Sequence, residues 1–283
     1  MPVLRRIGTE PSAAERFLES LADPARKPID ARDVAVVVAH PDDETIGCGA
    51  QLRRMRGVSV VMVTDGAPRS GQDAQRAGFA GAQAYADERA SELRMVLALG
   101  RIPETHVIPL GWADQTAALR LAELARRLLD LFAKRNIGTA LTHAYEGGHP
   151  DHDATAFAVH AAARLSAGAG HSLSVIEMPF YRAEDGAEIF QQFTPSRNPE
   201  TAVRLLPDEQ QLKKRMMDAH ATQREMLQHF AATVERFRQA PDYDFAALPN
   251  DGRVLYERHD WGMTGAKWLE LVRTAQCDLG VGA

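Results

Sequence analysis

The sequence predicts an α/β protein, a Rossmann-like three-layer sandwich with a mostly parallel sheet and a C-terminal cap made of a hairpin and helices. Short, continuous and β-branched runs such as residues 34–39 are typical of strands that are covered on both faces, as in parallel sheets. Such runs alternate with segments in which apolar residues recur at helical spacing. The resulting order β-α-β-α-β-α-β favours right-handed crossovers with helices on both faces of the sheet.

The elements of this core follow one another at short intervals. In order, we expect a strand over 34–39, a helix over 45–55, a strand over 58–64, a mobile loop over 67–82, a helix over 84–99, a strand over 106–110, a helix over 115–135, a strand over 137–141, a helix over 151–165 and a strand over 172–178. Turn residues separate several of them. Gly57 ends the first helix, Asp65 and Gly66 close the second strand, and Gly100 with Pro103 ends the second helix.

The pattern changes after Pro179. Residues 188–193 and 201–206 are expected to pair as a hairpin, and a helix is expected over 207–230. We therefore assign residues 1–178 to the Rossmann-like core and residues 179–283 to a cap packed on it, the two forming one structural unit.

Composition excludes several classes of protein. The 33 lysines and arginines stand against 38 acidic residues, a formal net charge of −5, so nucleic acid is not an expected partner. No apolar run approaches the ~20 residues of a membrane helix, and no signal-type segment opens the chain. The only two cysteines, Cys48 and Cys277, form no CxxC pair, which favours a cytoplasmic protein.

The histidines, in contrast, are unevenly distributed. His40 follows the first buried strand and leads into acidic residues, whereas His143, His149 and His152 follow the predicted strand 137–141. Ligands of open parallel sheets bind at the carboxyl ends of the strands, so both clusters are expected at the same edge of the sheet.

These residue types suit a catalytic zinc site, which takes three ligands from His, Asp and Glu and keeps one position open. Asp43 lies three residues after His40, and His152 three after His149, so each pair can point to a common centre. Asp42 can act as general base, and His149 can stabilise an oxyanion. Each acidic run alone could simply cap a helix. Capping, however, does not require imidazoles at two corresponding strand ends.

The two clusters resemble motifs of a known family. Residues 39–44, with the sequence AHPDDE, resemble the signature of the PIG-L/LmbE-type zinc-dependent N-deacetylases, and residues 149–152, HPDH, resemble their second motif about 110 residues downstream. Three further segments are similar to motifs of that family, namely residues 64–66, 89–92 and 220–223.

The resemblance implies an enzyme that removes an N-acyl group, above all N-acetyl, from a small N-acylated sugar or glycoside. It implies roles for six residues: zinc ligands His40, Asp43 and His152, and catalytic residues Asp42, His149 and Asp151, of which Asp151 orients His149. Arg89 and Asp114 match positions that contact sugar hydroxyls, and Tyr145 is near, but shifted from, an auxiliary tyrosine of some members. The resemblance also allows Fe²⁺ or another divalent metal, and a homo-oligomer.

Alternatives remain open at this point. His40 and Asp42 with a distant histidine also form the two-His, one-carboxylate triad of non-haem iron oxygenases, although those enzymes are usually β-barrels. A dinucleotide loop is disfavoured because Leu52 replaces the third glycine of the fingerprint. A catalytically inactive sugar-binding relative is a further alternative. The motifs do not identify the acyl substrate, which we expect the loop 67–82 and the cap to select.

Overall fold

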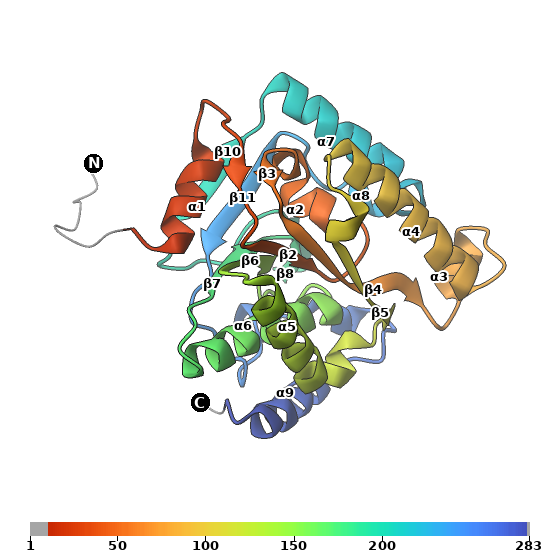
Figure 1. Ribbon diagram of the computed structural model, residues 1–283. Helices are drawn as coiled ribbons and strands as arrows, with labels where there is room; N and C mark the ends of the chain where they lie inside the picture. Colours follow the sequence, from red (N-terminus) through yellow and green to blue (C-terminus); the bar gives the residue numbers. More distant parts are fainter. Residues whose placement is uncertain (1–10, 282–283) are drawn as a thin grey trace.

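The computed structural model describes residues 11–281 as one large central sheet with helices on both faces (Figure 1). Within this range the sheet has seven strands in the order β10-β11-β7-β6-β2-β4-β5. In that order they are Glu200–Arg204, Val234–Gln239, Ser174–Met178, Thr139–His143, Val34–Val38, Ser59–Pro68 and Val107–Asp114. The five strands from β7 to β5 are parallel, whereas β10 and β11 are antiparallel additions at one edge. The predicted fold class is confirmed.

The central strand β2 shows that both faces of the sheet are covered by an apolar core. Its side chains alternate between the faces, so Val34, Val36 and Val38 pack into one apolar core while Ala35 and Val37 pack into the other. All five residues are buried. A strand with two buried faces has no polar positions, which is the reason for the continuous apolar run in the sequence.

The helices form the two outer layers (Figure 1). One layer contains α1 (Ala13–Ala22), α2 (Asp43–Leu52), α4 (Ala82–Leu99) and α7 (Pro207–Ala219), and the other contains α5 (Leu121–Arg135), α6 (Pro150–Gly168) and α9 (Gly265–Leu279). Shorter elements are α3 (Gln72–Arg76), α8 (Arg224–Leu227) and the 3-10 turns η1 (Glu104–His106), η2 (Ala117–Arg120), η3 (Ala221–Gln223), η4 (Asn250–Gly252) and η5 (Leu255–Arg258). No helix in the described range is long and apolar enough to cross a membrane.

The C-terminal part differs from the expected arrangement. The predicted hairpin between 188–193 and 201–206 is wrong, because β9 (Ala187–Phe190) pairs with β8 (Tyr181–Glu184) and β10 pairs with the unpredicted β11. The predicted helix 207–230 is interrupted at His220, where α7 ends. Residues after 178 therefore supply two strands of the central sheet as well as segments above its edge.

The expected loop 67–82 is also partly ordered into regular elements. Strand β4 continues to Pro68, and α3 occupies Gln72–Arg76. A second small sheet, β1 (Ile29–Asp30) with β3 (Met55–Arg56), lies outside the central sheet.

Candidate active site

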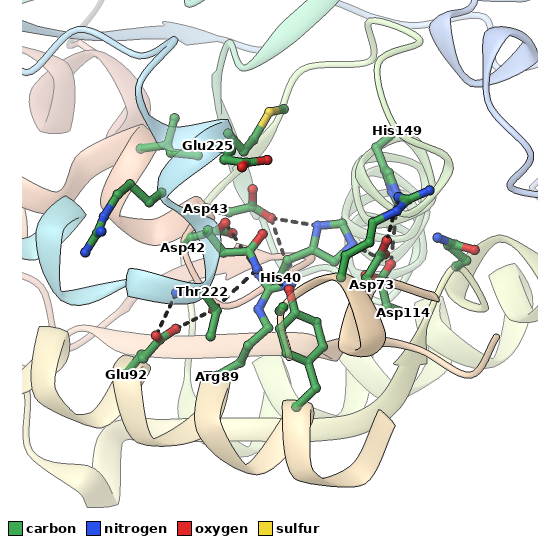
Figure 2. A pocket seen from close by; sticks show the side chains of 18 of the residues that line it. His40, Asp42, Asp43, Asp73, Arg89, Glu92, Asp114, His149, Thr222 and Glu225 are labelled. Carbon is green, nitrogen blue, oxygen red and sulfur yellow. Dashed lines mark hydrogen bonds and ion pairs between the residues drawn. The ribbon is translucent and has the colours of Figure 1, made fainter. Parts of the chain in front are cut away.

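The carboxyl ends of the parallel strands open into a cavity of about 980 Å³ (Figure 2). Strand β2 leads through His40 into α2, and β6 leads through the glycine-containing turn before His149 into α6. Both clusters line this one cavity, at the edge of the sheet where ligands of parallel sheets bind.

Two imidazoles and a carboxylate converge on the cavity floor. His40 Nδ1 lies 3.2 Å from His152 Nε2, and the carboxylate oxygens of Asp43 lie 3.4 Å from His40 Nδ1 and 3.3 Å from His152 Nε2. All three side chains are buried. This is the set of residues that the resemblance implied as metal ligands.

The donor set fits a divalent metal ion. Tetrahedral zinc ligands at normal bond lengths lie about 3.3 Å from one another, close to the separations found here. At 3.2 Å, the two facing imidazole nitrogens cannot both carry a proton, so a single proton or a metal cation has to lie between them. In the part of the chain that the structure describes, three overlapping groups in this region are close enough to hold a metal ion, and two of them contain His152, once with His40 and His149 and once with Asp43 and His143.

The second nitrogen of the His40 ring faces carboxylates. Its Nε2 lies 3.1 Å from Asp114 Oδ1 and 3.6 Å from Asp151 Oδ2. Burial lowers the pKa of His40, but Asp114, Asp151 and Asp43 outweigh it and raise this pKa well above the usual value. A carboxylate on the far nitrogen of a ligand histidine fixes the orientation of the ring. Asp114, which the resemblance implied as a sugar contact, thus also supports His40.

Asp151 is arranged differently from the expectation. Its carboxylate accepts the backbone N–H groups of Gln115 at 2.6 Å and Ala117 at 3.0 Å and faces His40 rather than His149. It is the backbone N–H of Asp151 that donates to His149 Nδ1, at 3.1 Å. The predicted orientation of His149 by the Asp151 side chain is therefore corrected to an orientation by its main chain.

His149 is held as a neutral hydrogen-bond donor. Because Nδ1 accepts a backbone N–H, the ring proton lies on Nε2, on the side of Asp114 Oδ1 at 3.8 Å. Burial and the neighbouring His40 lower the pKa of His149 well below its usual value. A neutral imidazole with its N–H in a metal-binding cavity can donate to an oxygen on which negative charge develops.

Asp42 lies next to the metal ligands in an unusual backbone conformation. Its φ of 140° is uncommon for a residue with a side chain. Although it precedes α2, its side chain makes no capping bond, so the capping interpretation does not apply to it. The carboxylate lies 3.4 Å from the Arg89 guanidinium. Burial raises the pKa of Asp42 to about 7 despite that cation, which suits a general base.

Arg89 connects three of the recognised motifs. Its guanidinium donates to the carbonyl of Gly66 at 2.6 Å and to that of Pro41 at 2.7 Å, besides the ion pair with Asp42. Gly66 has a φ of +67°, and a Cβ there would lie 2.5 Å from the guanidinium. The turn 64–66 therefore requires glycine so that Arg89 can pass close to its backbone.

Two other residues singled out in the sequence have structural contacts. Tyr145 does not line the cavity; its hydroxyl donates to the Ala247 carbonyl at 3.0 Å and accepts from Trp268 Nε1 at 2.7 Å. The predicted substrate contact of Tyr145 is therefore corrected to a packing role. His143 Nε2 accepts the Ala39 N–H at 2.9 Å and so joins the ends of β6 and β2.

Glu44 and His220 are functional neighbours to which the sequence assigned no role. Glu44 Oε2 accepts the Asp42 N–H at 3.1 Å, while its Oε1 lies 3.2 Å from His220 Nε2. Glu44 ends the AHPDDE motif and His220 begins the fifth motif. The available signal was that both residues belong to motifs of one family. The sequence could not show that they are in contact, because they lie 176 positions apart.

Comparison with protein families supports the resemblance to the PIG-L/LmbE-type deacetylases. Residues 35–163 match the family model described as PIG-L, GlcNAc-PI de-N-acetylase, which confirms the predicted resemblance. This match spans β2 to α6, including both metal-binding motifs. No curated protein sequence matches the chain.

Solved structures of deacetylases have a similar fold. The A40926 pseudoaglycone deacetylase Dbv21 is 16% identical over 74% of this chain and 97% of that chain, with a TM-score of 0.57. The zinc-inhibited form of the teicoplanin deacetylase Orf2 is 16% identical over 75% and 98%, with a TM-score of 0.57. The N,N'-diacetylchitobiose deacetylase of Pyrococcus horikoshii is 18% identical over 82% and 94%, with a TM-score of 0.55. These likenesses show the fold.

Proposed function

Because residues 35–163 of the chain match the PIG-L family model, we propose that the protein hydrolyses an N-acyl amide, first of all N-acetyl, on a small molecule that contains an amino sugar. The observation that carries the proposal is the convergence of His40, Asp43 and His152 with Asp42 and His149 on one cavity. The names of the family and of the three solved structures, all deacetylases, support the same reaction.

His40, Asp43 and His152 would hold the metal, zinc or another divalent ion such as Fe²⁺. When bound, the ion supplies a Lewis acid for the acyl carbonyl and makes the attacking water more acidic. Asp114, through its contact with Nε2, would hold the His40 ring in place for binding the ion.

The chain's own residues then divide the proton transfers. Asp42 takes a proton from the water as the water oxygen bonds to the acyl carbon. His149 Nε2–H donates to the former carbonyl oxygen, on which negative charge develops. When the carbon–nitrogen bond breaks, Asp42 returns its proton to the amine. The products are a free amino sugar and the carboxylic acid.

The oxygenase hypothesis has less support from the same residues. It used Asp42 as the carboxylate ligand, but Asp42 pairs with Arg89, and Asp43 lies beside the two histidines instead. The surrounding fold is an α/β sandwich rather than a β-barrel.

The test is acetate release from N-acetylated sugars and glycosides by the zinc-loaded protein, with metal content measured on the same sample. The variant Asp42→Asn should retain the metal and lose about 10²–10⁴-fold in kcat, the usual contribution of a general base. The exposed Asp87→Asn on α4 serves as the matched control and should behave as wild type. Full activity of Asp42→Asn would exclude the mechanism.

A further inference from the structure

The cavity is larger than a single amino sugar bound at the metal-binding cluster would fill. Its volume of about 980 Å³ is at the upper end of the range for pockets that enclose drug-sized ligands, about 300–1,000 Å³. The floor with His40 and Asp43 occupies one part, while α3, α4, α8 and β9 supply residues to the remaining wall. A single amino sugar at the floor leaves room for a further unit attached to it.

The charges of the lining are unbalanced. Of the described residues that line the cavity, eight are acidic, three are arginines and none is a lysine. The acidic groups on the floor, Asp42, Asp43 and Asp114, lie beside Arg89 or the histidines. Arg89 and the histidines offset part of their charge, and a further acidic residue, Glu92, is buried and accepts hydrogen bonds from Thr222.

The part of the lining that comes from α3, α4, α8 and β9, called the outer wall below, carries negative charge of its own. Glu88 on α4, Glu188 on β9 and Glu225 on α8 are exposed, and within residues 11–281 none of them forms an ion pair. On this wall Arg76 Nη1 lies 3.3 Å from Asp73 Oδ1, so the charges of these two residues offset each other. That leaves Arg224 as the uncompensated cation among the wall residues described. In Figure 2, Asp42, Asp43 and His40 lie between Glu225 and Arg89.

Acidic side chains alone do not make a binding site, but these line a cavity that ends at a metal-binding cluster. Clefts lined by one sign of charge concentrate ligands of the opposite sign and repel those of the same sign. The glutamates of the lining would repel a phosphate or carboxylate on the attached unit and attract an ammonium group.

Resting on the deacetylase function proposed above, we infer that the substrate is an N-acylated amino sugar joined to a further unit that carries positive charge, as in an amino-substituted glycoside. Units that bear phosphate or carboxylate are discriminated against. Selectivity arises at Glu88, Glu188 and Glu225, which line the cavity but are not part of the metal-binding cluster.

The experiment uses three disaccharides that differ only in charge. N-acetylglucosamine is joined to glucose, to glucosamine or to glucuronic acid, and acetate release is measured with the full zinc-loaded chain. We expect kcat/KM to be highest for the glucosamine compound and lowest for the glucuronate, with about 3–10-fold between neighbours, as for a few partly screened charges. The differences should shrink as the salt concentration rises.

A charge variant locates the effect. Glu225→Lys should raise KM for the glucosamine compound about 3–10-fold and lower it for the glucuronate. The matched control Glu19→Lys, exposed on α1 and absent from the cavity lining, should leave all three values unchanged. Equal kcat/KM for the three compounds, or a preference for glucuronate, would overturn the inference and leave the proposed function intact. No acetate from any of them, nor from other N-acetylated sugars, would refute the proposed function itself.

Discussion

At the scale of single residues, Asp114 has two candidate roles that can be separated. Its Oδ1 lies 3.1 Å from His40 Nε2, a contact that supports a metal ligand, and it also lines the cavity, where the resemblance implies a sugar contact. The His40 imidazole outweighs the effect of burial and lowers the pKa of Asp114, so the carboxylate is ionised and a strong acceptor. The two roles predict different kinetic results.

We expect Asp114→Ala to weaken metal affinity about 10–100-fold, the usual cost of losing such a supporting carboxylate. Metal affinity is measured by competition with a chelator, and Asp114→Asn, whose amide oxygen can still accept from Nε2, should recover part of the loss. The exposed Asp130→Asn on α5 is the control. A rise in KM with unchanged metal affinity would assign Asp114 to sugar binding alone.

His160 gives a pH dependence of stability. Its ring packs against Tyr243 and Phe245, and burial lowers its pKa to about 4, against about 6.5 in an unfolded chain. Below pH 6.5 the unfolded chain therefore binds a proton that the folded chain does not. Stability is lost as the pH falls from 6.5 towards 4, by about 1–2 kcal/mol at pH 5.

The variant His160→Phe should lack this loss. Urea unfolding at pH 7 and pH 5 would show the stability of the variant relative to wild type increasing by about 1–2 kcal/mol at the lower pH. His171→Gln, at an exposed histidine, should track the wild type. An unchanged difference between His160→Phe and wild type at the two pH values would show that His160 does not resist protonation in the fold.

At the scale of elements, a buried ion pair joins α2, α7 and β11. Lys213 Nζ donates to Glu235 Oε1 at 2.8 Å and to the Ile46 carbonyl at 2.8 Å, and the same carboxylate oxygen accepts the Ala50 N–H at 2.9 Å. Both charged side chains are fully buried. The pair thus holds the helix that begins at Asp43 against the C-terminal part of the chain.

Lys213→Met should destabilise the protein by about 3–5 kcal/mol, because it leaves the Glu235 carboxylate buried without its cation. The double variant Lys213→Met/Glu235→Gln should recover most of this loss, since the amide can still accept from Ala50. Denaturant unfolding measures both. A single variant within about 0.5 kcal/mol of wild type would mean that the pair contributes nothing to fixing α2.

The elements also show what sequence alone can predict. Strand β2 was predictable because both of its faces are apolar, and the position of His40 and Asp43 at its end followed from the direction of the chain. Strand β11 was missed because Glu235 and Arg238 are buried in it; they are paired with Lys213 and Glu177, partners that no local pattern reveals.

Sequence prediction failed within the site for the same reason, namely partners that are distant in the sequence. The directions of Asp151 and Tyr145 depend on partners in distant loops, the N–H groups of Gln115 and Ala117 for one and the Ala247 carbonyl for the other. Motif spacing places such residues at the right strand end, but it does not indicate which hydrogen bonds the side chains make.

At the scale of the whole molecule, metal binding should be coupled to folding. The donors come from the ends of β2 and β6, with His40 and His152 112 residues apart in sequence, and an unfolded chain does not hold them together. A ligand that binds only the folded state stabilises it by about 2.7 kcal/mol at 100 times its Kd, which raises Tm by about 5 °C for a chain of this size.

Thermal unfolding of the chelator-treated protein with and without added Zn²⁺ checks this coupling. His152→Ala should abolish the rise in Tm, because it removes one of the three donors that meet on the floor. His171→Ala, an exposed histidine, should keep the full rise. If zinc raised Tm equally in His152→Ala, the stabilising ion would bind elsewhere, and the convergence of β2 and β6 on one metal would lose its support.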